Sequence, residues 1–144
     1  MIREGHKLPE NVICRTPTLV EEIEKDSDIV ALYAFGSLAS GKLQPLSDLD
    51  FGILVAATLD KDKRFYKHLD LIGLFTDTFR TDEIDLVLMN DAPIRFSFNI
   101  LKTGNLLYYN NPLALVDYRE MIVKLYLDFK FYRDSFDEKF LEGI

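Results

Sequence analysis

Two aspartates, Asp48 and Asp50, flank a single leucine at the start of a segment that becomes apolar toward Val55. Residues two apart in a β-strand point to the same side of the sheet, so both carboxylates should lie within a few ångströms of each other. Carboxylates held that close repel each other unless a cation lies between them, and their hard oxygen atoms suit Mg²⁺ better than a soft metal. The spacing therefore predicts a magnesium site.

A third aspartate, Asp85, stands within the otherwise apolar run 84–89. That run is typical of a central strand, where a lone carboxylate is unfavourable and would be relieved by joining Asp48 and Asp50 across adjacent strands. Three acids that converge on two metal ions form the clamp used for in-line phosphoryl and nucleotidyl transfer. The alternative is an acid at the edge of the sheet, paired with a lysine or an arginine.

A small turn, Gly36-Ser37, closes the apolar run 29–35 and precedes Asp48 by a spacer of ten residues. Because glycine has no side chain, backbone N–H groups at this turn can approach a triphosphate closely, and the Ser37 hydroxyl adds a donor. The polar segment 37–47 is expected to be a loop or a short helical turn, whose amino end would favour an anion. Turn and acids together predict a site for a metal and a nucleotide, and the alternative is a coincidental acidic turn.

Hydrophobic periodicity predicts the elements that position these residues. Apolar runs favour strands at 29–35, 48–55 and 84–89, with a fourth, edge strand at 106–109. Helical spacing and capping residues predict helices at 16–26, 60–80, 93–104 and from 113 onward. In the second of these helices the predicted apolar stripe includes Phe65, Leu69, Ile72 and Phe79. The order of the elements predicts an α/β (α+β) fold, in which helices pack on a central sheet.

Length and composition bound the class of protein. The 144 residues suit a single domain, 1–144, with an amino-terminal arm at 1–15 and a carboxy-terminal helical segment at 113–142. A net charge of −7 argues against broad nucleic-acid binding. One cysteine and two histidines cannot supply an intramolecular disulfide or a usual zinc cluster. Because the sequence has neither a signal peptide nor a run of about 18 apolar residues, we expect a cytoplasmic protein without membrane contact.

Two further features have ordinary interpretations. Aromatic residues recur at helical spacing between Phe129 and Phe140, which indicates core or dimer packing more often than a ligand site. His68 lies between Lys67 and Asp70 on a predicted helix, and we expect it to be solvated or to cap a neighbouring group rather than to act in catalysis.

The turn Gly36-Ser37, the spacer, the triplet Asp48-Leu49-Asp50 and the later Asp85 together resemble the signature of the DNA polymerase β-like nucleotidyltransferase superfamily. More closely, the chain resembles the minimal nucleotidyltransferases of prokaryotes, a group that includes antitoxins encoded beside HEPN-domain toxins. The resemblance runs from about Val12 through Phe136 and includes the segment 100–109. It implies the DNA polymerase β-like fold, a central mixed sheet of about four strands with flanking helices.

The resemblance also implies roles for the acids and the turn. Asp48 and Asp50 would ligate both Mg²⁺ ions, while Asp85 would hold the catalytic ion and assist deprotonation of the acceptor. Gly36 and Ser37 would hold the β- and γ-phosphates of ATP.

The loop between turn and acids departs from the pattern of the group at one position. Relatives often carry an arginine where this chain has Ser40, so one cation facing the phosphates is missing. Lys42 is the residue available to replace it, although lysine is a point charge rather than a bidentate fork. We expect Lys42 and Ser47 to contact the nucleotide together with the turn.

The function implied by the resemblance is Mg²⁺-dependent transfer of AMP from ATP to a tyrosine hydroxyl of a cognate HEPN RNase toxin, which silences the toxin. The expected partners are that toxin, in a hetero-oligomer, and the nucleoside triphosphate. One alternative is the same chemistry on a small-molecule hydroxyl such as an aminoglycoside, although relatives of that kind usually carry an additional helical domain. The other is a non-catalytic nucleotide-binding module that neutralises its partner by covering it, which the serine at position 40 favours.

Overall fold

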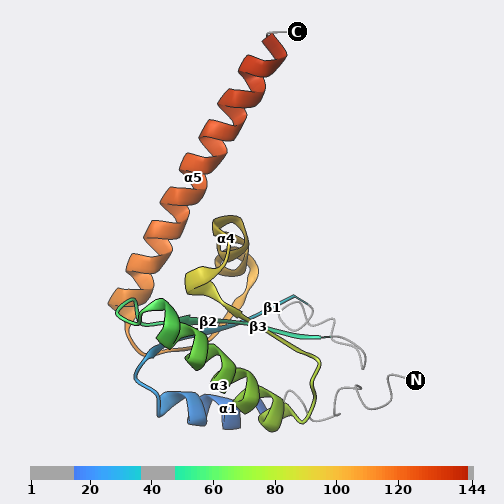
Figure 1. Cartoon of the computed structure of the whole chain (residues 1–144), viewed down its shortest axis with the longest axis vertical. Helices are drawn as coiled ribbons and strands as arrows, with labels where there is room; N and C mark the ends of the chain where they lie inside the picture. Colours follow the sequence, from blue (N-terminus) through green and yellow to red (C-terminus); the bar gives the residue numbers. More distant parts are fainter. Residues whose placement is uncertain (1–14, 37–47, 143–144) are drawn as a thin grey trace, which may run out of the picture.

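The computed structural model describes residues 15–36 and 48–142 of the chain. Their order of elements is that predicted from the sequence. The elements are α1 (Thr16–Glu24), β1 (Ile29–Phe35), β2 (Leu49–Val55), α3 (Lys61–Phe79), β3 (Ile84–Leu88), the 3₁₀ turn η3 (Met89–Asp91), α4 (Ile94–Thr103), β4 (Asn105–Tyr109) and α5 (Pro112–Glu142) (Figure 1). Of the predicted amino-terminal arm, only Arg15 is among the described residues.

The strands of the described residues form one mixed sheet with the order β3-β2-β1-β4. β1 runs antiparallel to both β2 and β4, whereas β2 and β3 are parallel because α3 connects them as a crossover helix. The predicted mixed sheet of about four strands is therefore confirmed, as is the edge position of β4.

The prediction that 84–89 forms a central strand is wrong, because β3 is the opposite edge of the described sheet. Its apolar composition has another cause. Leu86 and Leu88 pack into the core beneath α3, while Val87 packs on the other face of the sheet. Because helices cover both faces of the sheet, the apolar side chains of β3 are buried or half-buried even though β3 pairs with only one strand of the described sheet. Its sequence is therefore as apolar as that of a central strand.

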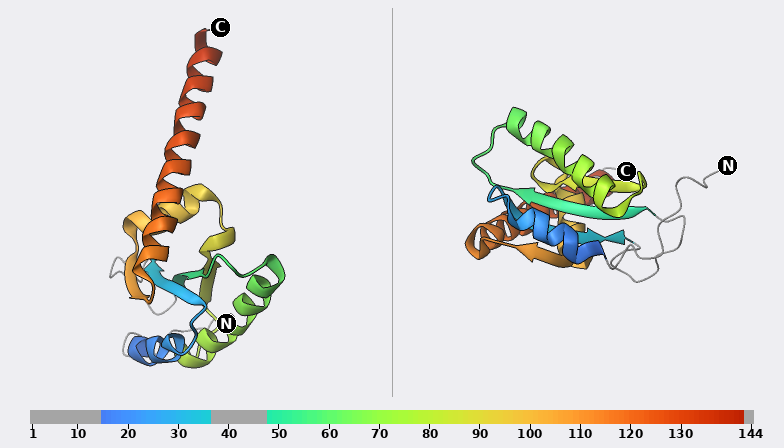
Figure 2. Two further views of the ribbon diagram at one scale, coloured as in Figure 1. Left: turned by 90° about the vertical axis from the view of Figure 1, so that its left-hand side faces the viewer. Right: turned by 90° about the horizontal axis from the view of Figure 1, so that it is seen from below.

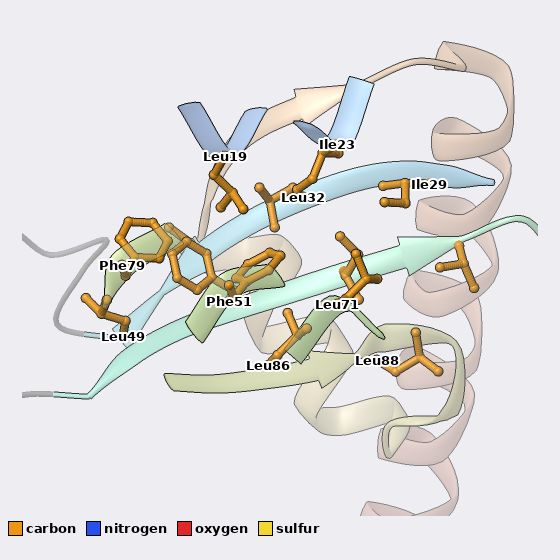
Figure 3. Packing of buried hydrophobic residues seen from close by; sticks show 14 residues of the cluster. Leu19, Ile23, Ile29, Leu32, Leu49, Phe51, Leu71, Phe79, Leu86 and Leu88 are labelled. Atoms are coloured by element: carbon orange, nitrogen blue, oxygen red, sulfur yellow. The ribbon is translucent and has the colours of Figure 1, made fainter. Parts of the chain in front are cut away.

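Helices cover both faces of the sheet (Figure 2). On one face, α1 contributes Leu19 and Ile23, and α3 contributes Leu71, Phe75 and Phe79, to a core shared with the strands (Figure 3). On the other face, Ile100 of α4 and Leu115 of α5 pack with a second set of buried residues, Val30, Ala31, Tyr33, Leu54 and Met89. The alternation along β2 directs Leu49 and Phe51 to the first face, so Asp48 and Asp50 face the side of α4 and α5.

The first core centres on a cluster of aromatic rings. Phe51 packs edge-on against Phe75, with ring centroids 5.0 Å apart, and stacks on Phe79 at 5.5 Å. Phe75 is completely buried, so Phe75→Ala is expected to lower the free energy of unfolding by about 3–5 kcal/mol, measured by urea denaturation. Leu69→Ala, at a half-exposed position of the same helix, is the control and should change stability by less than about 0.5 kcal/mol. Equal losses for the two variants would contradict this description of the core.

α5 packs on the domain only through its first half. Ile122 is buried, and the ring of Tyr126 stacks on Phe98 of α4 with centroids 3.9 Å apart. Beyond that point the helix extends away from the sheet (Figure 1). Phe129, Tyr132 and Phe136 are 53%, 71% and 69% exposed, so the prediction that they pack in a core of this chain is wrong. Packing of these residues against another chain stays a prediction. None of the helices within 15–36 and 48–142 has the length and apolarity needed to cross a membrane.

Candidate active site

The carboxylates of the predicted metal site come together across neighbouring strands. Asp48 directly precedes β2 and is exposed, and Asp50 is the second residue of that strand and is partly buried. In the sheet register, Asp50 pairs with Asp85 of β3 on one side and with Phe35 of β1 on the other. The expected juxtaposition of Asp85 with the acid pair is therefore present in the fold.

The electrostatics of Asp50 reflect this crowding. Burial, followed by the negative charges of Asp85 and Asp48, raises the pKa of the Asp50 carboxyl to about 6. Each of these effects disfavours an ionised carboxylate, and a cation between the acids would oppose them. Among the described residues, no group of three or more histidine, cysteine or acidic side chains is arranged to hold a metal ion. Mg²⁺ is usually bound by only one or two carboxylates together with substrate phosphates, so the oxygen atoms of Asp48 and Asp50 suit it in their chemistry.

Asp85 occupies a different environment from the one predicted. It is exposed, because it lies near the start of an edge strand rather than within the core. The alternative prediction, an acid at the edge of the sheet, is therefore correct for the position of Asp85. That alternative also predicted a salt bridge with a lysine or an arginine, and the salt bridges found in the described part of the chain do not include Asp85. Among the described strands β3 has no partner on its outer side, and the exposed Asp85 lies on that edge.

Gly36 lies against the acids at the end of β1. Its φ of +64° is in the left-handed region, which L side chains rarely adopt. A Cβ atom at this position would overlap Oδ2 of Asp50 and lie 3.2 Å from its Cγ. The absence of a side chain therefore leaves space for the Asp50 carboxylate, whereas access for phosphate at this position stays a prediction.

Several residues predicted to contact the nucleotide lie outside the described residues. These are Ser37, Lys42 and Ser47, together with Ser40, where relatives often carry an arginine. Their expected contacts stay predictions.

A groove next to the acids was not predicted from the sequence. It has a volume of about 740 Å³ and is lined by Asp85 and Val87 of β3, by Phe65 and His68 of α3, and by Phe96 of α4, among others. The face of α3 that packs against the sheet is not the face predicted from the helical spacing of its apolar residues. Phe65, Leu69 and Ile72, predicted for the buried stripe, are 58%, 50% and 38% exposed, whereas Leu71 and Phe75 are buried together with Phe79.

Of the two ordinary roles predicted for His68, solvated or capping, the structure shows the second. Its Nε2 lies 2.6 Å from the backbone carbonyl oxygen of Leu86, and because a carbonyl only accepts hydrogen bonds, Nε2 carries the proton and donates it. The histidine thereby satisfies an outward-facing carbonyl on the open edge of β3.

Comparison with solved structures identifies the fold. A toxin–antitoxin crystal structure with AMP-PNP matches with a TM-score of 0.62 and 22% identity, covering 93% of this chain and 99% of that chain. A complex of tri-AMPylated Shewanella oneidensis HEPN toxin with MNT antitoxin matches with a TM-score of 0.62 and 17% identity, over 90% and 98% of the two chains. The MntA–HepT toxin–antitoxin structure matches with a TM-score of 0.62 and 16% identity, covering 90% of this chain and 98% of that chain. At these identities the likeness shows a shared fold.

Comparison of the sequence with protein families and with curated proteins gives two further results. No curated protein matches the chain. The family model described as polymerase beta, nucleotidyltransferase matches residues 18–113, which is about two thirds of the chain and contains Gly36 and all three acids. The chain therefore belongs to the polymerase β family of nucleotidyltransferases.

Proposed function

We propose that this protein transfers AMP from ATP to a tyrosine hydroxyl of a HEPN-domain toxin and thereby acts as its antitoxin. The observation that carries the proposal is the position of Asp50, which pairs in the sheet with Asp85, is influenced by the charge of Asp48 and lies against Gly36. The solved relatives support the partner and the reaction. Among them are a toxin–antitoxin structure with AMP-PNP and an MNT antitoxin bound to a tri-AMPylated HEPN toxin.

In this proposal Asp48, Asp50 and Asp85 share the binding of Mg²⁺. Asp48 and Asp50 would ligate the Mg²⁺ ions, and Asp85 would hold the catalytic one. When bound, the ions would neutralise negative charge on the phosphates and polarise the α-phosphorus. Gly36 and Ser37 hold the β- and γ-phosphates, with Lys42 and Ser47 as further contacts.

Asp85 is also the proposed proton acceptor. Its carboxylate takes the proton of the acceptor hydroxyl as the oxygen forms a bond with the α-phosphorus of ATP. The bond between the α-phosphorus and the oxygen that bridges it to the β-phosphate breaks, and pyrophosphate leaves with the electron pair. The products are an AMP-modified tyrosine and pyrophosphate.

The test is transfer of label from α-labelled ATP to a purified HEPN-domain protein that forms a complex with this chain, in the presence of Mg²⁺. Asp48→Asn is expected to reduce the initial rate by about a hundredfold or more, because one metal ligand loses its charge. Asp70→Asn removes an exposed acid from α3, on the opposite face of the sheet, and is the control that should keep the wild-type rate.

Three results would contradict the proposal. Equal transfer rates for Asp48→Asn and wild type would mean that Asp48 takes no part in AMP transfer. A stable complex without any label on the toxin would favour the non-catalytic binding module. Label on an aminoglycoside, with none on the protein, would favour the small-molecule alternative.

A further inference from the structure

The groove beside the acids follows the open edge of β3, between the amino-terminal half of α3 and the start of α4. Its walls are mainly apolar. Phe65 and Phe96 line it and are 58% and 42% exposed, so both rings are accessible to an occupant of the groove. Aromatic walls of this kind favour an occupant that buries a flat, apolar group.

The walls are held by specific contacts. Arg64 of α3 forms a bidentate ion pair with Asp91, at 2.9 and 3.0 Å, and also donates to the carbonyl of Leu59 at 2.8 Å, which ties the start of α3 to η3. Phe96 packs edge-on against Phe35, the last residue of β1, with ring centroids 5.7 Å apart. The groove is thus part of the folded framework, and its Phe96 wall is anchored beside the candidate active site.

The open edge of β3 limits how a ligand can enter. An exposed edge strand commonly binds another strand through its backbone groups. Here the carbonyl of Leu86, in the middle of β3, already accepts a hydrogen bond from His68. The occupant is therefore expected to insert a side chain into the groove rather than to extend the sheet.

Asp85 connects the groove to the proposed reaction, because it lines the groove and pairs in the sheet with Asp50. β1, which ends at Gly36, lies on one side of β2, and β3 lies on the other. In an in-line displacement the leaving pyrophosphate and the attacking oxygen lie on opposite sides of the α-phosphorus. With the phosphates at Gly36, the attacking oxygen approaches from the β3 side, where the groove is.

We propose that this groove binds the acceptor tyrosine of the partner protein, with its ring against Phe65 and Phe96 and its hydroxyl directed to Asp85. This inference rests on the proposed function, since it names the subsite that the proposed reaction requires. The size of the groove leaves room for residues that flank the tyrosine, and Lys61 supplies a charged group for them. A serine or threonine would leave the aromatic walls without contact.

The first test separates acceptor binding from nucleotide binding. Phe65→Ala is expected to lower kcat/KM for the HEPN protein by about tenfold, through loss of one aromatic contact, and to leave the Kd for AMP-PNP unchanged. Leu69→Ala removes an exposed apolar side chain one turn further along α3 that does not line the groove, and both constants should stay at wild-type values. An unchanged kcat/KM for Phe65→Ala would overturn the inference. A weaker Kd for AMP-PNP would also overturn it, since the groove would then bind the nucleotide base.

The second test does not depend on transfer. Phe65→benzoylphenylalanine, illuminated in the complex with the HEPN protein, is expected to cross-link to a partner peptide that contains the modified tyrosine. Cross-links confined to other peptides, or none, would overturn the inference even if AMP transfer occurs. Conversely, a cross-link to a tyrosine-bearing peptide without any transfer of label would contradict the proposed function and leave the groove as a docking site.

Discussion

Asp50→Asn is expected to raise the melting temperature of the metal-free protein at pH 7.5 by about 3–6 °C while abolishing AMP transfer. The pKa of this carboxyl is raised from its ordinary value of 3.8 to about 6 by burial and by Asp85 and Asp48. Above pH 6 the folded protein therefore holds a charge that is less favourable than in the unfolded chain. The shift corresponds to at most about 3 kcal/mol, and solvent screening at this partly exposed group reduces it toward about 1 kcal/mol.

The pH dependence of stability shows whether the Asp50 charge stabilises or destabilises the folded state. Because the pKa in the folded state is above that of the unfolded chain, the folded state binds the proton more tightly. The stabilisation from this proton is fully present below pH 3.8 and is lost as the pH rises through about 6. Asparagine has no such titration, so the difference in melting temperature between variant and wild type should shrink as the pH falls from 7.5 to 4.

Differential scanning fluorimetry at pH 4 and 7.5, with and without Mg²⁺ and AMP-PNP, measures both parts of the prediction. Wild type should gain stability from Mg²⁺ and nucleotide, whereas Asp50→Asn should gain little. Asp70→Asn serves again as the control, since it removes a negative charge from the exposed surface of α3. A melting temperature for Asp50→Asn that is lower than wild type at pH 7.5 would contradict the unfavourable charge assigned to this site.

The acid site could largely be predicted from the sequence because its geometry is local. The spacing of Asp48 and Asp50 fixes their common side of the sheet, and an apolar run around Asp85 places that residue on a strand. The edge position of β3 could not be predicted in the same way. Strand order depends on where the crossover through α3 places β3, and a period of two residues carries no information about neighbours in the sheet.

The aromatic residues show the same limit more clearly. Phe65 and Phe75 lie ten positions apart on one helix and are both apolar, yet one lines an open groove and the other is completely buried. Helical periodicity finds a stripe but does not fix its rotation when apolar residues occupy more than one face. An apolar residue on the exposed face of a helix therefore signals a binding surface only after the structure has shown which face is buried.

Gly36→Ala is expected to reduce AMP transfer by about a hundredfold and to lower the free energy of unfolding by about 1–3 kcal/mol. Two effects combine at this position. The backbone φ of +64° is unfavourable for any residue with a side chain, at about 1 kcal/mol. The added Cβ would also overlap Oδ2 of Asp50, so this carboxylate must move away from the place where the metal and the nucleotide are proposed to bind.

A matched glycine and a double variant separate the two effects. At Gly73 on α3 a Cβ would meet no atom within 4 Å, so Gly73→Ala should keep full activity and raise stability by about 0.5–1 kcal/mol. In an Asp50→Ala background the overlap disappears, and urea denaturation should show that Gly36→Ala now lowers stability only by the backbone contribution of about 1 kcal/mol. An equal loss in both backgrounds would mean that backbone strain alone explains the effect. The coupling between the two positions therefore tests whether Gly36 serves the site by leaving space for Asp50.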